Sequence, residues 1–325
     1  MAIEDYAVWL IVWLFAVGAC IGSFMNVVVY RLPAGQNLLY PGSRCPSCAQ
    51  PIRPYHNIPI FGWLALRGRC ADCGARISPR YPAVELATAL LFALLAWVGP
   101  LSGGKNLPGA VDAAQGLLWG IYVYDLTLVC ALICAALIDS DGHPLPKRLV
   151  AALLVAGLAA PLIWPDLRPI HSGLAGNAAS GTWPAWLIGL TDGLAGLSAA
   201  LILSCLARPA AARGPSGPSG RMNTAAVLTW VGVYLGWQAV CWLAALTAVL
   251  FLAALLAGRH WPAARSVGWP GWLALATSCW LLAPSGCWLL APSGCWFSIF
   301  FLQGDRAFLD NQRQPLASRT HRRES

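Results

Sequence analysis

The chain has 325 residues, of which 58% are hydrophobic and only 10% are charged, and its formal net charge is +8 at pH 7. Soluble domains carry charge on about a quarter of their residues, so this composition excludes a water-soluble globular protein and indicates a membrane protein. The positive charges gather in the segments between apolar runs, which favours a role in membrane topology over nucleic-acid binding.

Apolar runs near the length needed to cross a bilayer recur along the chain. They cover residues 8–25, 83–98, 117–138, 149–164, 184–207, 224–257 and 267–283. The run at 224–257 is long enough for two helices joined by a turn around Gly236, so we expect about eight membrane-spanning helices. Lipid offers backbone groups no hydrogen-bond partners, so the predicted fold class is an all-α polytopic bundle. Glu4 and Asp5 precede the first run, which we expect to be a retained helix and not a cleaved signal peptide.

Basic residues occupy alternate loops, which predicts the orientation of the chain. The first loop, the segment after the third run and the segment after the fifth run hold Arg31, Arg44, Arg53, Arg67, Arg69, Arg76 and Arg80, then Lys147 and Arg148, then Arg208, Arg213 and Arg221. By the positive-inside rule these segments are cytoplasmic, and the N-terminus lies outside.

Four cysteines stand together in the first loop. Cys45 and Cys48 form one Cys-x-x-Cys pair, and Cys70 and Cys73 form a second pair, with 21 residues between the two pairs. Two such pairs supply the tetrahedral four-thiolate set of a structural zinc site. The alternative, a pair of redox dithiols, calls for a thioredoxin-like βαβ context that the pattern lacks. The loop has little apolar sequence of its own, so we expect bound zinc to supply its folding energy.

A series of short motifs in the first 90 residues resembles the N-terminal region of type IV prepilin leader peptidases, also called prepilin peptidase/N-methyltransferases. These motifs are Gly22-Ser23-Phe24-Met25-Asn26-Val27-Val28, Arg31-Leu32-Pro33, Pro41-Gly42-Ser43-Arg44-Cys45-Pro46-Ser47-Cys48, Asn57-Ile58-Pro59-Ile60, Gly68-Arg69-Cys70-Ala71-Asp72-Cys73 and Arg80-Tyr81-Pro82-Ala83-Val84-Glu85.

The resemblance implies a bacterial inner-membrane enzyme with two activities. As an aspartic peptidase it would remove the basic leader of type IV prepilins and pseudopilins. As a methyltransferase it would then methylate the new N-terminus from S-adenosylmethionine, with the zinc loop belonging to the region responsible for that step. The expected division is residues 1–82 for the first helix and the cytosolic zinc loop, 83–302 for a peptidase-like membrane domain, and 303–325 for a disordered basic tail.

Aspartic proteolysis needs two carboxylates, one acting as base on water while the other polarises the scissile carbonyl. In the family resembled, the first follows Ile at a helix end, and Ile138-Asp139 matches that segment, so Asp139 is the predicted first acid. The second is expected in a Gly-x-Gly-Asp-x-Lys-Leu segment before a stretch similar to residues 228–238. Counting back from Gly236 puts that position on Thr224, so the acid itself is missing.

The missing acid leaves two hypotheses open. The chain is either a working prepilin peptidase/N-methyltransferase, or a catalytically decayed relative that binds prepilins or keeps only methyl transfer. A transporter is disfavoured because no intramembrane pair of charged residues marks a pathway. Beyond this region, an eight-residue segment starting at Cys279 recurs unchanged at 287–294, which indicates a recent duplication of the coding sequence.

Overall fold

The computed structural model describes residues 3–104, 114–168, 184–211, 218–257 and 277. Within these ranges the chain is helical, and its only β pairing is two isolated bridges in the loop after the first helix. Except for Thr277, the predicted last span, the repeated octapeptide and the basic tail lie outside the described residues. The all-α fold class expected from composition is thus confirmed.

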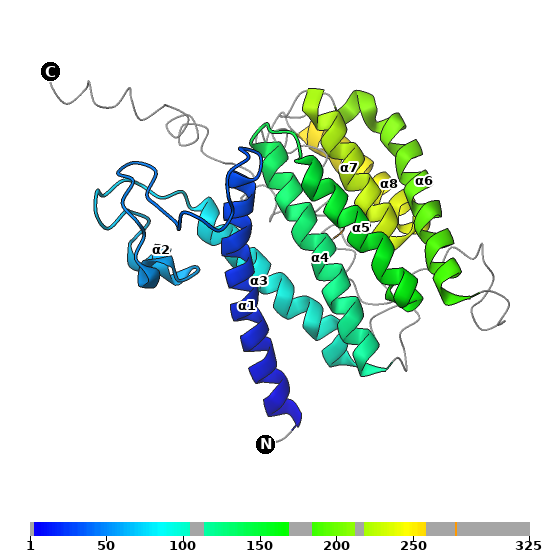
Figure 1. Ribbon diagram of the computed structural model, residues 1–325, viewed down its shortest axis with the longest axis horizontal. Coiled ribbons are helices and arrows are strands. Elements are labelled where there is room, and N and C mark those ends of the chain that lie inside the picture. The colour runs from blue at the N-terminus through cyan, green and yellow to red at the C-terminus, as the bar shows by residue number, and fades with distance from the viewer. Residues whose placement is uncertain (1–2, 105–113, 169–183, 212–217, 258–276, 278–325) are drawn as a thin grey trace.

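Two long helices and a loop that contains a short third helix form the N-terminal part, and five helices form a bundle beside it (Figure 1). The N-terminal part contains α1 (Ile3–Arg31), the short α2 (Phe61–Ala65) and α3 (Arg80–Val98). The bundle contains α4 (Gln115–Ser140), α5 (Lys147–Ile163), α6 (Ala185–Ala211), α7 (Pro218–Leu235) and α8 (Trp237–Ala257). Three single-turn helices, η1 (Pro54–Asn57), η2 (Pro100–Ser102) and η3 (Pro165–Leu167), lie in the connections.

These helices coincide, within a few residues at each end, with the apolar runs up to residue 257. The predicted break at Gly236 is confirmed, because α7 ends at Leu235, α8 begins at Trp237, and Gly236 takes a φ of +92°. Glycine adopts this backbone conformation without the steric cost that a Cβ would bring. By length and composition, the described residues hold four helices able to cross a membrane, namely Tyr6–Arg31, Arg80–Ser102, Gln115–Ser140 and Trp186–Leu206.

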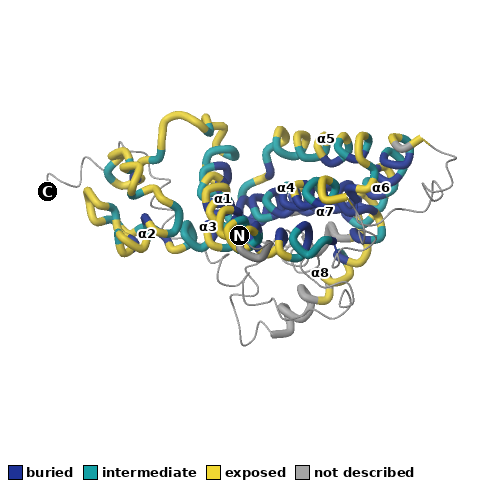
Figure 2. Tube along the Cα trace, turned by 90° about the horizontal axis from the view of Figure 1, so that it is seen from below, coloured by how far each residue is buried: buried dark blue, intermediate teal, exposed yellow. Residues whose placement is uncertain are grey.

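Helix α4 lies at the centre of the molecule and α1 at its margin. Most of α4 is buried among its neighbours, whereas Trp9 and Trp13 of α1 expose 69% and 62% of their surface. Figure 2 shows the same gradient, with the dark segments concentrated in α4 and α7. Exposed aromatic rings on an apolar helix are consistent with contact to lipid, where their apolar surface is not exposed to water.

Helices α1 and α3 approach closely at two glycines of α1. A Cβ added to Gly18 would lie 2.8 Å from the Cα of Ala89, and one added to Gly22 would lie 2.8 Å from the Cα of Glu85. Glycines four residues apart on one face are the usual device for close helix contact in membranes, where packing replaces the hydrophobic effect. This crossing places Glu85 against the C-terminal half of α1, which the charge pattern predicts to lie toward the cytoplasm.

One buried arginine joins three helices of the bundle. Arg168, which exposes 2% of its surface, donates hydrogen bonds from Nε and its two terminal nitrogens to the backbone carbonyls of Val233, Gly189 and Gly157. These acceptors belong to α7, α6 and α5. Hydrogen bonds from a charged donor to backbone carbonyls stabilise the cation in a low-dielectric interior. Arg168 therefore links α5, α6 and α7.

Candidate functional site

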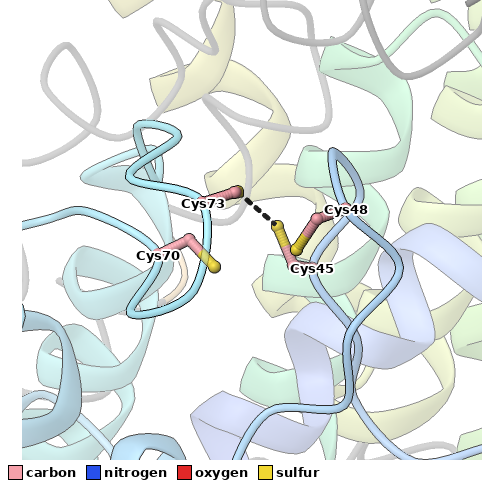
Figure 3. Close-up of side chains that lie close together, drawn as sticks. All are labelled: Cys45, Cys48, Cys70 and Cys73. Atoms are coloured by element: carbon pink, nitrogen blue, oxygen red, sulfur yellow. Dashed lines mark hydrogen bonds between the residues drawn. The ribbon is translucent and has the colours of Figure 1, made fainter.

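The four cysteines predicted to bind metal lie together in the folded loop. Their sulfur atoms all lie within 4.8 Å of one another, and Cys45 Sγ and Cys73 Sγ are 3.8 Å apart. Figure 3 shows the two pairs facing each other across a small gap. Four sulfurs at zinc's usual bond length of about 2.3 Å lie about 3.8 Å apart in a tetrahedron. The spacing of the thiols therefore fits a zinc ion.

The two cysteine pairs are built in the same way. In each, the first cysteine accepts a hydrogen bond from the N–H four residues later, Ala49 to Cys45 at 2.8 Å and Gly74 to Cys70 at 3.0 Å. Both donors have a positive φ, 59° for Ala49 and 70° for Gly74. The N–H of the first cysteine in turn bonds the carbonyl of the residue five positions on. Each tight turn thus directs two thiols to one point.

The surroundings of the thiols give Cys70 and Cys45 different pKa values. The backbone N–H of Cys73 lowers the pKa of Cys70 to about 7, whereas burial raises the pKa of Cys45 to about 12. Thiols bind metal as thiolates, so Cys70 is the ligand that ionises most easily at neutral pH. A complete set of four thiolates leaves no open position for a substrate, which makes the site suited to a structural role.

An ion pair connects the end of this loop to the end of α4. Arg80, the first residue of α3, holds both carboxylate oxygens of Asp141 at 2.6 and 3.0 Å, and it also donates to the carbonyl of Leu137 at 3.3 Å. The two side chains expose only 13% and 15% of their surface. Two-pronged arginine–carboxylate contacts have a defined geometry. The four-cysteine loop and the C-terminal end of α4 therefore lie at the same end of the molecule.

The predicted first acid, Asp139, lies in the last turn of α4 and exposes 2% of its surface. The helix ends just beyond it in a Schellman motif, with Gly142 at a φ of +76°. In this motif the N–H of His143 bonds the carbonyl of Ile138, and the N–H of Gly142 bonds the carbonyl of Asp139. The sharp reversal turns the following segment back alongside the Asp139 side chain.

Asn223, on α7, contacts Asp139 directly. Its Nδ2 donates to Asp139 Oδ1 at 2.8 Å and to the carbonyl of His143 at 2.9 Å, and its Oδ1 accepts the N–H of Leu145 at 2.8 Å. Asn223 is fully buried. Because the Leu145 N–H can bond only an oxygen, these contacts fix which end of the amide faces the carboxylate. The amide is a neutral donor to Asp139 in a buried site.

The predicted position of the second acid, Thr224, is the next residue on α7. Its side chain is also buried, but its hydroxyl has no hydrogen-bond partner, so the contact with Asp139 is made one residue earlier. Two other acids lie differently: Asp141, just beyond the end of α4, binds Arg80, and Asp125 of α4 is buried at about 21 Å along the axis from Asp139. Lys147 begins α5 at the same end as Asp139.

Asn223 was not predicted from the sequence, because the motif register that points to Thr224 has no asparagine beside the expected acid. A polar amide at the start of an otherwise apolar helix is a signal that could have found it, since such a residue usually has a buried partner. Glu85 was recognised only as part of a motif. In the structure its carboxylate accepts the backbone N–H of Ile60 at 2.7 Å.

Comparisons with known proteins match part of this chain. Residues 16–98 match the Bacterial Peptidase A24 N-terminal domain. A prepilin leader peptidase/N-methyltransferase of Myxococcus xanthus is 41% identical over 46% of this chain and 39% of its own length. One from Klebsiella pneumoniae is 41% identical over 45% of this chain and 59% of its own length. One from Neisseria gonorrhoeae is 34% identical over 53% of this chain and 62% of its own length. No solved structure matches the chain.

The chain thus spans about half the length of the curated relatives it matches. The matched domain, residues 16–98, begins inside α1, contains all four cysteines and ends with α3. It therefore takes in the loop, the candidate metal centre and Glu85. Residues 16–98 thus resemble a Bacterial Peptidase A24 N-terminal domain, and the chain is similar to prepilin leader peptidase/N-methyltransferases.

Proposed function

We propose that this protein is a prepilin leader peptidase/N-methyltransferase, which cleaves the leader of type IV prepilins or pseudopilins and methylates the new N-terminus. The observation that carries the proposal is the match of residues 16–98 to the A24 N-terminal domain, at whose centre the four thiols lie at zinc spacing. Two relatives, each 41% identical over a little under half of this chain, bear both activities in their name.

The proposed roles follow from the chemistry of the residues. Zinc bound by Cys45, Cys48, Cys70 and Cys73 is structural and folds the loop, which lies on the cytoplasmic side of a bacterial inner membrane. Asp139 acts as the base on water in leader cleavage. S-adenosylmethionine supplies the methyl group. In that step the amine nitrogen gains the methyl carbon while the carbon–sulfur bond breaks, and the amine gives up one proton to solvent.

A second function, prepilin binding with methyl transfer but little leader cleavage, is favoured by one contact. The group beside Asp139 is the Asn223 amide at 2.8 Å. An amide cannot give up a proton to a leaving group as the second acid of an aspartic dyad does. Under this alternative the membrane domain retains the peptidase architecture while the cleavage step is slow.

The test is a direct assay of both activities on one substrate. Purified protein in proteoliposomes is incubated with a prepilin, or with an already cleaved pilin carrying a free N-terminal amine, together with S-adenosylmethionine. Mass spectrometry then measures leader loss and the added methyl group separately. Both products would support the full function, and methylation of cleaved pilin alone would support the second. Neither product from a zinc-loaded, folded sample would overturn both.

A further inference from the structure

A cavity of about 730 Å³ lies beneath the four-cysteine loop, bounded by the C-terminal end of α1 and the first turns of α3. This volume falls in the range of pockets that enclose a cofactor or drug-sized ligand, roughly 300–1,000 Å³. Its wall includes the aromatic side chains of Tyr30, Trp63 and Tyr81. Trp63 is fixed in place, since its indole N–H bonds the carbonyl of Ile77 at 3.0 Å. The cavity thus has a rigid wall with flat apolar surfaces.

The wall carries both signs of charge. Glu85, an acidic residue that exposes 8% of its surface, lines the cavity, and Arg44 and Arg76 line it from the two cysteine turns. Two more arginines of the wall are engaged elsewhere: Arg31 bonds the carbonyls of Asn37, Leu38 and Gly42, and Arg53 lies 3.6 Å from Asp72. A ligand matched to this wall carries a cationic group, an anionic group and a flat ring.

Glu85 is held in position by the backbone around it. Its Oε2 accepts the N–H of Ile60, a residue in a γ-turn with φ 64° and ψ −56°, closed by the N–H of Phe61 on the carbonyl of Pro59 at 2.6 Å. This conformation is rare and strained for a β-branched residue. Strain of this kind concentrates at ligand sites, where the surrounding structure maintains it. On the other side, Gly22 brings α1 within contact of the Glu85 backbone.

We propose that this cavity is the binding site for S-adenosylmethionine, with Glu85 as the carboxylate that attracts the positively charged sulfonium of the ligand. The inference rests on the proposed methyl transfer, and it assigns that activity to a specific place in the fold. The ligand unites the three features that the wall calls for: sulfonium and ammonium cations, a carboxylate for the arginines, and an adenine ring for the aromatic surfaces. A basic leader peptide fits poorly, because the arginines of the wall would repel it.

Binding to the full-length protein, measured by calorimetry in detergent or nanodiscs, tests this site without relying on catalysis. Unmodified protein should bind S-adenosylmethionine, and Glu85→Gln should weaken binding about 10-fold or more, because a hydrogen-bonded charge is lost. The loss should be smaller for S-adenosylhomocysteine, which lacks the sulfonium charge. Glutamine can still accept the Ile60 N–H, so the turn is preserved. Tyr30→Ala, which removes another aromatic residue of the lining, should weaken both ligands and leaves the contact between Glu85 and Ile60 intact.

The matched control is Asp72→Asn, which removes an acid at the rim of the same cavity. Asp72 is exposed and faces Arg53, so the affinity should stay within about two-fold, with zinc content confirming an intact loop. Binding that is unchanged in both Glu85→Gln and Tyr30→Ala would overturn the inference while leaving the proposed function standing. Absence of both binding and methylation would overturn the proposed function itself.

Discussion

Replacing Asn223 by aspartate should restore a pair of acids at the end of α4. Asn223 Nδ2 lies 2.8 Å from Asp139 Oδ1, so the new carboxyl oxygen would take a position in hydrogen-bond contact with Asp139. Two carboxylates this close share one proton, which gives one base and one acid at neutral pH. General acid participation contributes about 10²–10⁴-fold to a rate. We therefore expect leader cleavage by Asn223→Asp to rise at least about 100-fold over the unmodified chain.

The substitution should cost little in folding. A protonated aspartate still accepts the N–H of Leu145 and still donates to Asp139, so of the contacts made by Asn223 it loses the donation to the carbonyl of His143. One buried acceptor left without a donor costs about 1–3 kcal/mol of unfolding free energy. Thermal unfolding in detergent measures this loss, and single-turnover cleavage of a prepilin at several pH values measures the gain.

Thr224→Asp is the matched comparison, made alone and together with Ala226→Lys. It places the acid where motif register puts it, one residue away, and on an α-helix the next side chain is rotated by about 100°. We expect no cleavage from it, whereas Asn223→Asp should lose its activity again when Asp139→Asn is added. Cleavage gained by the Thr224 variants and not by Asn223→Asp would refute the reasoning from the contact.

Three further outcomes are expected. Purified protein should hold one zinc per chain by elemental analysis, and the Cys45→Ser/Cys70→Ser double variant should hold none, since a closed four-thiolate site has no spare ligand; full occupancy in that variant would contradict the site. Gly22→Ala should destabilise the protein by about 1–3 kcal/mol through the contact of its new Cβ with the Glu85 backbone, whereas Gly116→Ala, which meets open space, should be neutral or stabilising in thermal unfolding. An impermeant thiol reagent should reach the loop cysteines only after cells are opened and zinc is chelated; labelling in intact cells would argue against a cytoplasmic loop.

The sequence was informative wherever one short segment determines a geometry. Two Cys-x-x-Cys turns direct thiols inward whatever surrounds them, so the cluster of Cys45, Cys48, Cys70 and Cys73 could be predicted from spacing alone. Gly236 could be predicted as the break between α7 and α8 because the apolar run around it exceeds one membrane crossing. Both conclusions depend on local chemistry or length, which the sequence states directly.

Contacts between distant segments were beyond the same reasoning. Asn223 meets Asp139 because α7 crosses α4 with a particular rotation, and counting residues from Gly236 does not determine which face of α7 is turned inward. The contact of Glu85 with Ile60 joins a helix to a strained turn 25 residues earlier, and no periodic pattern records it. Likewise Asp141 is bound to Arg80, which lies 61 residues earlier in the chain.

That ion pair affects how variants of the cysteine loop should be interpreted. Arg80, at the end of the loop, forms a partly buried ion pair with Asp141. Asp141 lies two residues after Asp139. Breaking such a pair by displacing one partner leaves an unneutralised charge and is strongly destabilising. A cysteine variant that unfolds the loop thereby also loosens the end of α4. Loss of leader cleavage in such a variant would therefore reflect the coupling of the loop to the end of α4. It would not by itself show that cleavage takes place in the loop.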